Sequence, residues 1–254
     1  MSLPVLVTFL GYFEIVLCLA AFGFIVLRKQ WRDYWAIGSF LAVRAVTSTF
    51  LTFLVHSFGH FDKVTAYSLY FYVYWLSFAV EAVLGLFVLY GVFRLATTPL
   101  RGLQWLGMMV FGFLAAISVL LAFGSAFAPG VAGPRYIMGT VAQLQQVQSI
   151  LTLGLMLFIF LAIRPMGLSY RSKVFGVSLG LAIMAILNLV QSAWSSHNIR
   201  MRPVFNVVNG VVVCATLAIW AGYFAMREPE RREVMLPAGS VFVRLNRMGL
   251  GWFG

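Results

Sequence analysis

The segment that decides the fold is VLVTFLGYFEIVLCLAAFGFIVL, residues 5–27. Glu14 is the one charged residue within it. Because a helix rises about 1.5 Å per residue, a run of roughly 20 apolar residues spans the hydrocarbon core of a bilayer, which is about 30 Å thick. No basic residue precedes this run, and residues 3–27 exceed the apolar length of a secretory signal. We therefore expect a transmembrane helix that is retained in the protein.

Six more apolar segments of the same kind follow along the chain. They are residues 35–56, 67–93, 105–127, 140–163, 174–195 and 204–226. The chain is 62% hydrophobic and 10% charged, a composition typical of integral membrane proteins. Short connections between the segments favour antiparallel neighbours in one bundle. The sequence predicts an all-α, polytopic membrane protein, a bundle of seven transmembrane helices.

The basic residues predict the orientation of this bundle. With the N-terminus outside and the C-terminus in the cytoplasm, 13 Lys and Arg lie on the inner side and 4 on the outer side. The inner residues are Arg28, Lys29, Arg32, Arg94, Arg101, Arg164, Arg171, Lys173, Arg227, Arg231, Arg232, Arg244 and Arg247, and the outer ones are Lys63, Arg135, Arg200 and Arg202. Cytoplasmic loops are enriched in basic residues, so this split favours the N-outside arrangement.

The composition changes after the last apolar segment. Residues 1–226 are expected to form the seven-helix transmembrane domain, and residues 227–254 a basic and aromatic cytoplasmic tail. The tail is expected to lie on membrane lipid, or to dock a protein partner or a second copy of the chain. The net charge of +11 is spread over several inner segments with no nucleic-acid-binding fold to present it, so no nucleic-acid partner is expected. We expect the protein in a bacterial inner (plasma) membrane.

Polar residues inside the apolar segments gather in the halves predicted to lie on the outer side. Asn188 and Gln191, and likewise Asn206 and Asn209, are three residues apart and share a helical face. Unpaired polar groups in hydrocarbon are costly, so such side chains should face one another or water. The expected ligand pocket consists of Tyr70, Tyr74, Phe78, Glu81, Gln146, Asn188, Gln191, Asn206 and Asn209. The alternative is that these side chains bond directly to one another and only hold the helices together.

An aromatic face leads to one of the acidic residues of this pocket. Tyr70, Tyr74 and Phe78 recur every four residues toward Glu81. Aromatic rings beside a carboxylate suit a small cationic or aromatic ligand that arrives from the outer side. Tyr and Trp also anchor helices at the membrane interface, which is the alternative role of the outermost rings.

Three charged residues lie deep within the apolar segments. Counted from the predicted inner helix ends, Arg44 lies about 14 Å deep, Glu81 about 18 Å and Glu14 about 20 Å. A lone arginine at this depth is costly, so we expect these buried charges to pair, Arg44 first with Glu81 and second with Glu14. One carboxylate is then expected to remain without a cation. The pair either fixes the helix register or forms the charged floor of the pocket.

Cofactor and enzyme chemistry find little support in the chain. Cys18 and Cys214 lie in different apolar segments and are expected to be small buried hydrophobes. His56, His60 and His197 are weak candidates for a metal site, but solvated loop histidines are the favoured interpretation, so no metal is expected. The chain has no lysine in residues 204–226 for a retinal Schiff base, no glycine-rich phosphate loop and no nucleophile elbow. We expect a protein that is not an enzyme and has no cofactor.

Two classes of function fit this pattern best. A sensor or receptor-like binding module needs an outward-facing pocket, a closed apolar inner half and a cytoplasmic face for signalling or docking. A small-molecule transporter needs a polar path through both halves and broken helices, whereas none of the seven segments has a proline near its middle. We favour the sensor, and the alternatives are an accessory or scaffold subunit of a larger membrane assembly and a transporter. In general shape the pattern resembles the seven-helix sensory regions that precede signalling domains in bacteria.

Overall fold

A computed structural model describes residues 3–57, 63–98, 134–162, 169–195, 202–227 and 243–244, and single residues between 102 and 120. Six long helices account for most of these residues. They are α1 (Leu3–Leu27), α2 (Trp31–Ser57), α3 (Lys63–Ala96), α5 (Pro134–Ala162), α6 (Lys173–Ser195) and α7 (Arg202–Ala225). The described part of the chain contains no strand, as the sequence predicts for an all-α protein.

Five of these helices are long and apolar enough to cross a membrane: α1, α2, α3, α6 and α7. In α5 the apolar part is shorter and runs over Gln145–Leu161. The predicted helix over residues 105–127 lies largely outside the described residues, although Gln104, Trp105 and Met108 are helical. The fold is that of a helical membrane protein.

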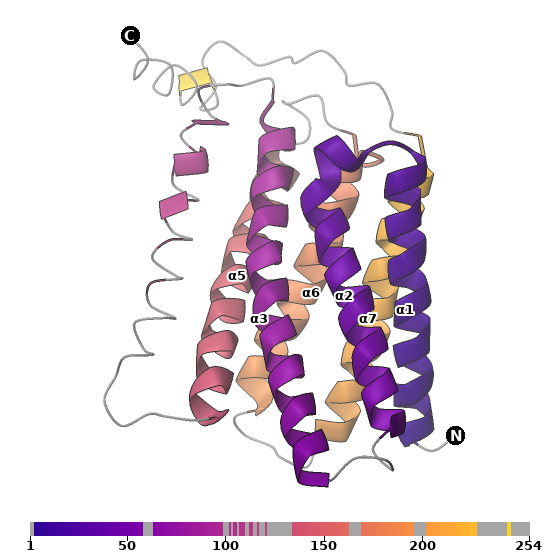
Figure 1. Ribbon diagram of the computed structural model, residues 1–254. Coiled ribbons are helices and arrows are strands. Elements are labelled where there is room, and N and C mark those ends of the chain that lie inside the picture. Colours follow the sequence, from indigo (N-terminus) through magenta and orange to yellow (C-terminus); the bar gives the residue numbers. More distant parts are fainter. Residues whose placement is uncertain are drawn as a thin grey trace.

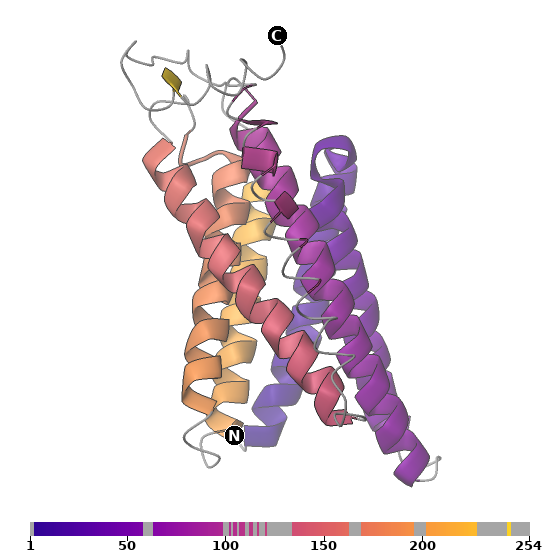
Figure 2. The same cartoon turned by 90° about the vertical axis from the view of Figure 1, so that its left-hand side faces the viewer.

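The six helices follow one another around a closed ring (Figure 1). Each packs on its neighbours in the chain, α3 also packs on α5, and α7 closes the ring against α1. Figure 2 shows α5 running obliquely across the front of α6 and α7. The helices α1, α3, α5 and α7 all begin at the same end of the bundle, which we call the N-end. We call the opposite end the C-end.

The turn between α1 and α2 is set by one residue with a left-handed backbone. Lys29 has φ 56°, and its N–H donates to the carbonyl of Val26 at 2.9 Å, while that of Gln30 donates to the carbonyl of Ile25 at 3.0 Å. These two bonds form a Schellman motif, which satisfies carbonyls left free at a helix end. The chain then re-enters a helix at Trp31, and Tyr34 has non-helical angles (φ −119°, ψ 26°), so the regular part of α2 begins near residue 35, where the sequence predicts it.

The packed core lies in the C-end half of the ring. The largest fully buried side chains include Trp220, Phe224, Leu89 and Ile159, each beyond the middle of its helix toward the C-end. Trp220 packs edge-on against Phe40, with ring centroids 6.1 Å apart, and its indole N–H donates to the carbonyl of Val177 at 3.3 Å. The buried indole N–H of Trp220 is therefore satisfied within the core.

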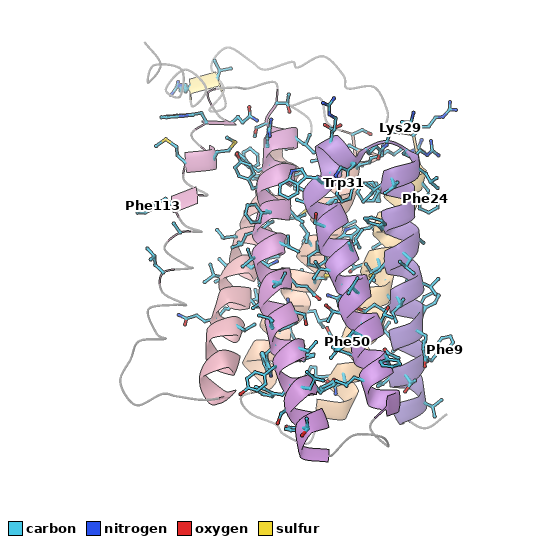
Figure 3. All side chains as sticks on the ribbon, in the orientation of Figure 1. Phe9, Phe24, Lys29, Trp31, Phe50 and Phe113 are labelled. Atoms are coloured by element: carbon cyan, nitrogen blue, oxygen red, sulfur yellow. The ribbon has the colours of Figure 1, made fainter. Side chains whose placement is uncertain are left out.

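The outward faces of the helices are apolar. Phe9 projects away from the bundle on α1 with 59% of its surface exposed (Figure 3), and Val46, Leu76 and Leu161 are equally open. Exposed apolar side chains at this density belong in contact with lipid. Away from their ends, the described helices carry three charged side chains, those of Glu14, Arg44 and Glu81.

Candidate ligand pocket

The three deep charges meet at one point of the ring. The Arg44 guanidinium donates through Nε to Glu14 Oε1 and through Nη1 to Glu81 Oε2, both at 2.8 Å. We call these residues, from α1, α2 and α3, the charge triad. Between 12 and 17% of each side chain remains exposed. The expected contact of Arg44 with Glu81 is present, and the second carboxylate is not left without a cation, because one planar guanidinium can donate to two partners at once.

The triad leaves a local negative charge. Two carboxylates share one guanidinium, so with all three groups ionised the cluster carries one net negative charge. Ser48 adds a weak hydroxyl donor to Glu14 Oε1 at 3.4 Å. The hydroxyls of Thr49 and Thr52 instead donate to backbone carbonyls one turn back, at 2.7 Å, so these two polar residues of α2 are satisfied within their own helix.

A cavity of about 390 Å³ opens beside the triad. Arg44 and Glu81 line it, together with residues of α5, α6 and α7 that lie near the middle of each helix and toward the N-end. Seven residues of the predicted pocket line this cavity: Tyr74, Phe78, Glu81, Gln146, Asn188, Gln191 and Asn209. Ligand pockets in proteins measure about 300–1,000 Å³, so this cavity can hold a small molecule.

Two predicted pocket residues lie outside the cavity. Asn206 is exposed on the first turns of α7, one turn nearer the N-end than Asn209. Tyr70 stacks on Tyr74 with ring centroids 6.2 Å apart, but it too lies beyond the lining. Both residues were predicted to belong to the pocket because they share a helical face with residues that line it. That face continues along the helix past the end of the cavity.

The amides of the pocket are not bonded to one another. Among the described residues, no hydrogen bond joins any two of Gln146, Asn188, Gln191 and Asn209, and none of their polar atoms is both fully buried and unpaired. The described buried polar atoms without a partner are Gln30 Oε1 and Thr216 Oγ1. The four amide side chains line the cavity without direct bonds to one another.

The aromatic wall of the pocket is a stack along α3. Tyr74 stacks on Phe78 with centroids 5.7 Å apart and an interplanar angle of 19°, and Trp75 meets Phe78 edge-on at 6.0 Å. Four-residue spacing places successive rings nearly above one another on a helix, which is why the stack forms. It ends at Glu81, one turn below Phe78, so the rings and the carboxylate share one wall.

One residue that lines the pocket but was not in the predicted set, Gln148 of α5, packs against a glycine of α3. Gly85 of α3 lies against the side chain amide of Gln148 of α5, where a Cβ atom on residue 85 would overlap that amide. Gln148 and the nearly fully buried Ser149 and Thr152 also line the cavity. The Thr152 hydroxyl donates to the carbonyl of Gln148 at 2.7 Å. In the sequence, the position of Gly85 about one turn from Glu81 was the signal that another helix could approach closely there. Only the structure shows that this helix is α5.

Both cysteines are buried and free, as expected, and Cys214 Sγ lies 3.7 Å from the carbonyl of Leu10. The side chain of His56 and all of His60 and His197 lie outside the described residues. Within the described part of the chain, no three His, Cys, Asp or Glu side chains are grouped to hold a metal.

Comparison of the chain with protein-family models, with curated proteins and with solved structures gave no match.

Proposed function

We propose that this chain is a membrane sensor or receptor-like binding module, without enzymatic activity, whose pocket takes a small ligand from the outer side. In this proposal seven helices cross a bacterial inner membrane with the N-terminus outside, and the basic tail of residues 227–254 meets lipid or a partner in the cytoplasm. The observation that carries the proposal is the contrast between the two halves of the ring. Open amides and aromatic rings line a cavity toward the N-end, and a packed apolar core fills the C-end.

The chemistry of the lining favours a cationic ligand with an aromatic or alkyl body. With its three groups ionised the triad contributes one net negative charge, and the rings of Tyr74 and Phe78 share a wall of the pocket with Glu81. Cations are attracted to aromatic faces and to carboxylates. The amides of Gln146, Asn188 and Asn209 supply both donors and acceptors to orient the polar groups of such a ligand.

The proposal is tested by ligand-dependent stabilisation of the full chain in detergent. A panel of aromatic amines and quaternary ammonium compounds is expected to contain members that raise the melting temperature, because a ligand that binds the folded state stabilises it by mass action. Asn209→Ala and Gln146→Ala should remove this increase and cost little stability, since water can replace the lost partner.

The chain offers matched controls on the same helices. Asn206 and Gln143 are exposed and lie outside the cavity, so Asn206→Ala and Gln143→Ala should leave the ligand response intact. If the pocket substitutions instead each lower stability by about 0.6 kcal/mol and no cation shifts melting, the amides hold helices together, and a scaffold role replaces the sensor. Counterflow of a binding cation in proteoliposomes would identify a transporter.

A further inference from the structure

Residues at the beginning of α2 and at the end of α3 line a second hollow. Both of these helix ends lie at the C-end of the bundle (Figure 1). The hollow measures about 980 Å³, at the upper end of the range for ligand sites, and is separate in its lining from the pocket of the charge triad. Arg32 and Asp33 of α2 and Arg94 of α3 line one part of it, and Phe87, Leu95 and Met108 line another. We call this hollow the interfacial groove.

The charged part of the groove has two guanidinium groups available. Arg32 and Arg94 are both exposed, and neither forms an ion pair with another described residue. Asp33 is the acidic side chain among the described lining residues, which leaves one net positive charge. Two arginines from different helices that line one hollow offer several N–H donors, and a phosphate group accepts several hydrogen bonds.

The apolar part continues along the helices from this charged end. Phe87 lies two turns from Arg94 toward the middle of α3, and 48% of its side chain is exposed. Its ring meets that of Trp35 with centroids 6.0 Å apart. Trp35 and Trp105 also line the groove, and tryptophan is enriched at membrane interfaces.

We propose that the interfacial groove binds one anionic phospholipid of the surrounding bilayer, with its phosphate against Arg32 and Arg94 and an acyl chain along Phe87 and Met108. Basic hollows between transmembrane helices at the level of the headgroups bind anionic lipids. A single net positive charge complements the single negative charge of a phosphodiester. The groove joins arginines near the helix ends to aromatic and apolar side chains, as a lipid joins a charged headgroup to its chains. This site does not depend on the ligand of the other pocket.

Native mass spectrometry of the full chain, with dioleoylphosphatidylglycerol and dioleoylphosphatidylcholine as probes, tests the proposal. The wild-type protein should retain one phosphatidylglycerol in preference to phosphatidylcholine. Arg32→Gln with Arg94→Gln should weaken phosphatidylglycerol binding by roughly 10- to 30-fold, because each arginine near an anionic lipid contributes to its attraction. The control is Arg171→Gln with Arg227→Gln, which removes the same charge from exposed C-end residues outside the groove and should leave binding unchanged.

Three results would overturn the proposal. Equal losses in the groove variant and in the control would show a diffuse charge effect. Equal retention of the two lipids by the wild-type protein would show an apolar crevice without headgroup recognition. Displacement of the lipid by glycerol phosphate at equal concentration would show a site for a soluble anion. If the groove variant does not fold, a salt titration of the wild-type protein tests the proposal instead. The preference for phosphatidylglycerol must fall as salt screens the arginines, and a preference that does not change with salt would overturn the proposal.

Discussion

Arg44 is the residue on which the electrostatics of the pocket depends. Its guanidinium contacts carboxylates from two other helices at 2.8 Å each, so it joins α1, α2 and α3 near the middle of the bundle. In a medium of low polarity an unpaired charge is very costly, while a planar donor with several N–H groups can neutralise two partners in part. The three residues therefore respond unequally to substitution, although they form one cluster.

Arg44→Met should be the most damaging change in the triad. It strands two carboxylates near the middle of the membrane, and removal of one partner from a buried ion pair costs about 3–5 kcal/mol. Glu81→Gln should cost less, because it leaves the pair of Arg44 and Glu14 intact and electrically neutral. Unfolding of the purified variants in denaturant measures both. Combining Arg44→Met with Glu81→Gln should recover part of the loss, and strictly additive costs would show that the two side chains do not interact.

Lys29 holds the turn between α1 and α2 in a backbone conformation that favours glycine. Lys29→Gly should raise stability relative to Lys29→Ala by about 1 kcal/mol, because only the alanine variant keeps the strain of a positive φ. Both variants lose the same charge, so their difference in thermal melting isolates the backbone effect. Equal melting temperatures would contradict a left-handed conformation at this residue.

At the scale of elements, the contact of α6 with α7 depends on glycines. Gly176 lies against the ring of Tyr223 and Gly180 against the indole of Trp220, so a Cβ at either residue would overlap an aromatic side chain. Spacing of four residues places both glycines on one face of α6, an arrangement that is common where helices pack closely. The approach allows the Trp220 indole to reach the carbonyl of Val177 on α6.

Gly180→Val should destabilise the bundle by about 1–3 kcal/mol, the usual cost of overpacking. Gly222 of α7 provides the control, because a Cβ there would meet nothing within 4 Å. Gly222→Ala should be neutral or stabilise by up to about 1 kcal/mol, since alanine favours a helix over glycine. Thermal unfolding of the two variants in one detergent gives the comparison, and a stable Gly180→Val protein would rule out the tight α6–α7 contact.

At the scale of the whole molecule, polarity and packing are divided between the two ends. The cavity and its amides lie toward the N-end, and the fully buried aromatic side chains lie toward the C-end. The predicted orientation would place the cavity toward the outside, where a sensor meets its ligand. Orientation is therefore the property of the whole molecule on which the proposed function depends.

Labelling of introduced cysteines in intact cells tests the orientation. Cysteines at Gly130 and Ser196 should react with a membrane-impermeant reagent from outside, and cysteines at Thr98 and Gly167 should not. The native Cys18 and Cys214 are buried and give little background. The reverse labelling pattern would place the pocket on the cytoplasmic side and remove the argument for an external ligand.

Much of the helix content and most of the pocket could be predicted from the sequence. Apolar run length fixes where a chain can cross hydrocarbon, because every backbone polar group must be satisfied within the segment. The bounds of α1, α6 and α7 accordingly lie within two residues of those expected. Seven of nine pocket residues line the cavity, since polar side chains at one depth must avoid lipid. The sequence pattern wrongly included Tyr70 and Asn206 in the predicted pocket. Periodicity identifies one face of a helix, but it does not give the point along that face where a cavity ends.

The amino-acid sequence by itself predicted the six described helices, the place of the three charges near the middle of their helices, and the end of the bundle toward which the polar side chains gather. Tertiary structure alone decided that one guanidinium serves both carboxylates, and that Gly85 of α3 lies against Gln148 of α5. The physical reason is that crossing a membrane is a local property of each segment, set by its own apolar length. Pairing and packing between segments depend instead on the rotation and tilt of each helix against its neighbours, which no single segment encodes.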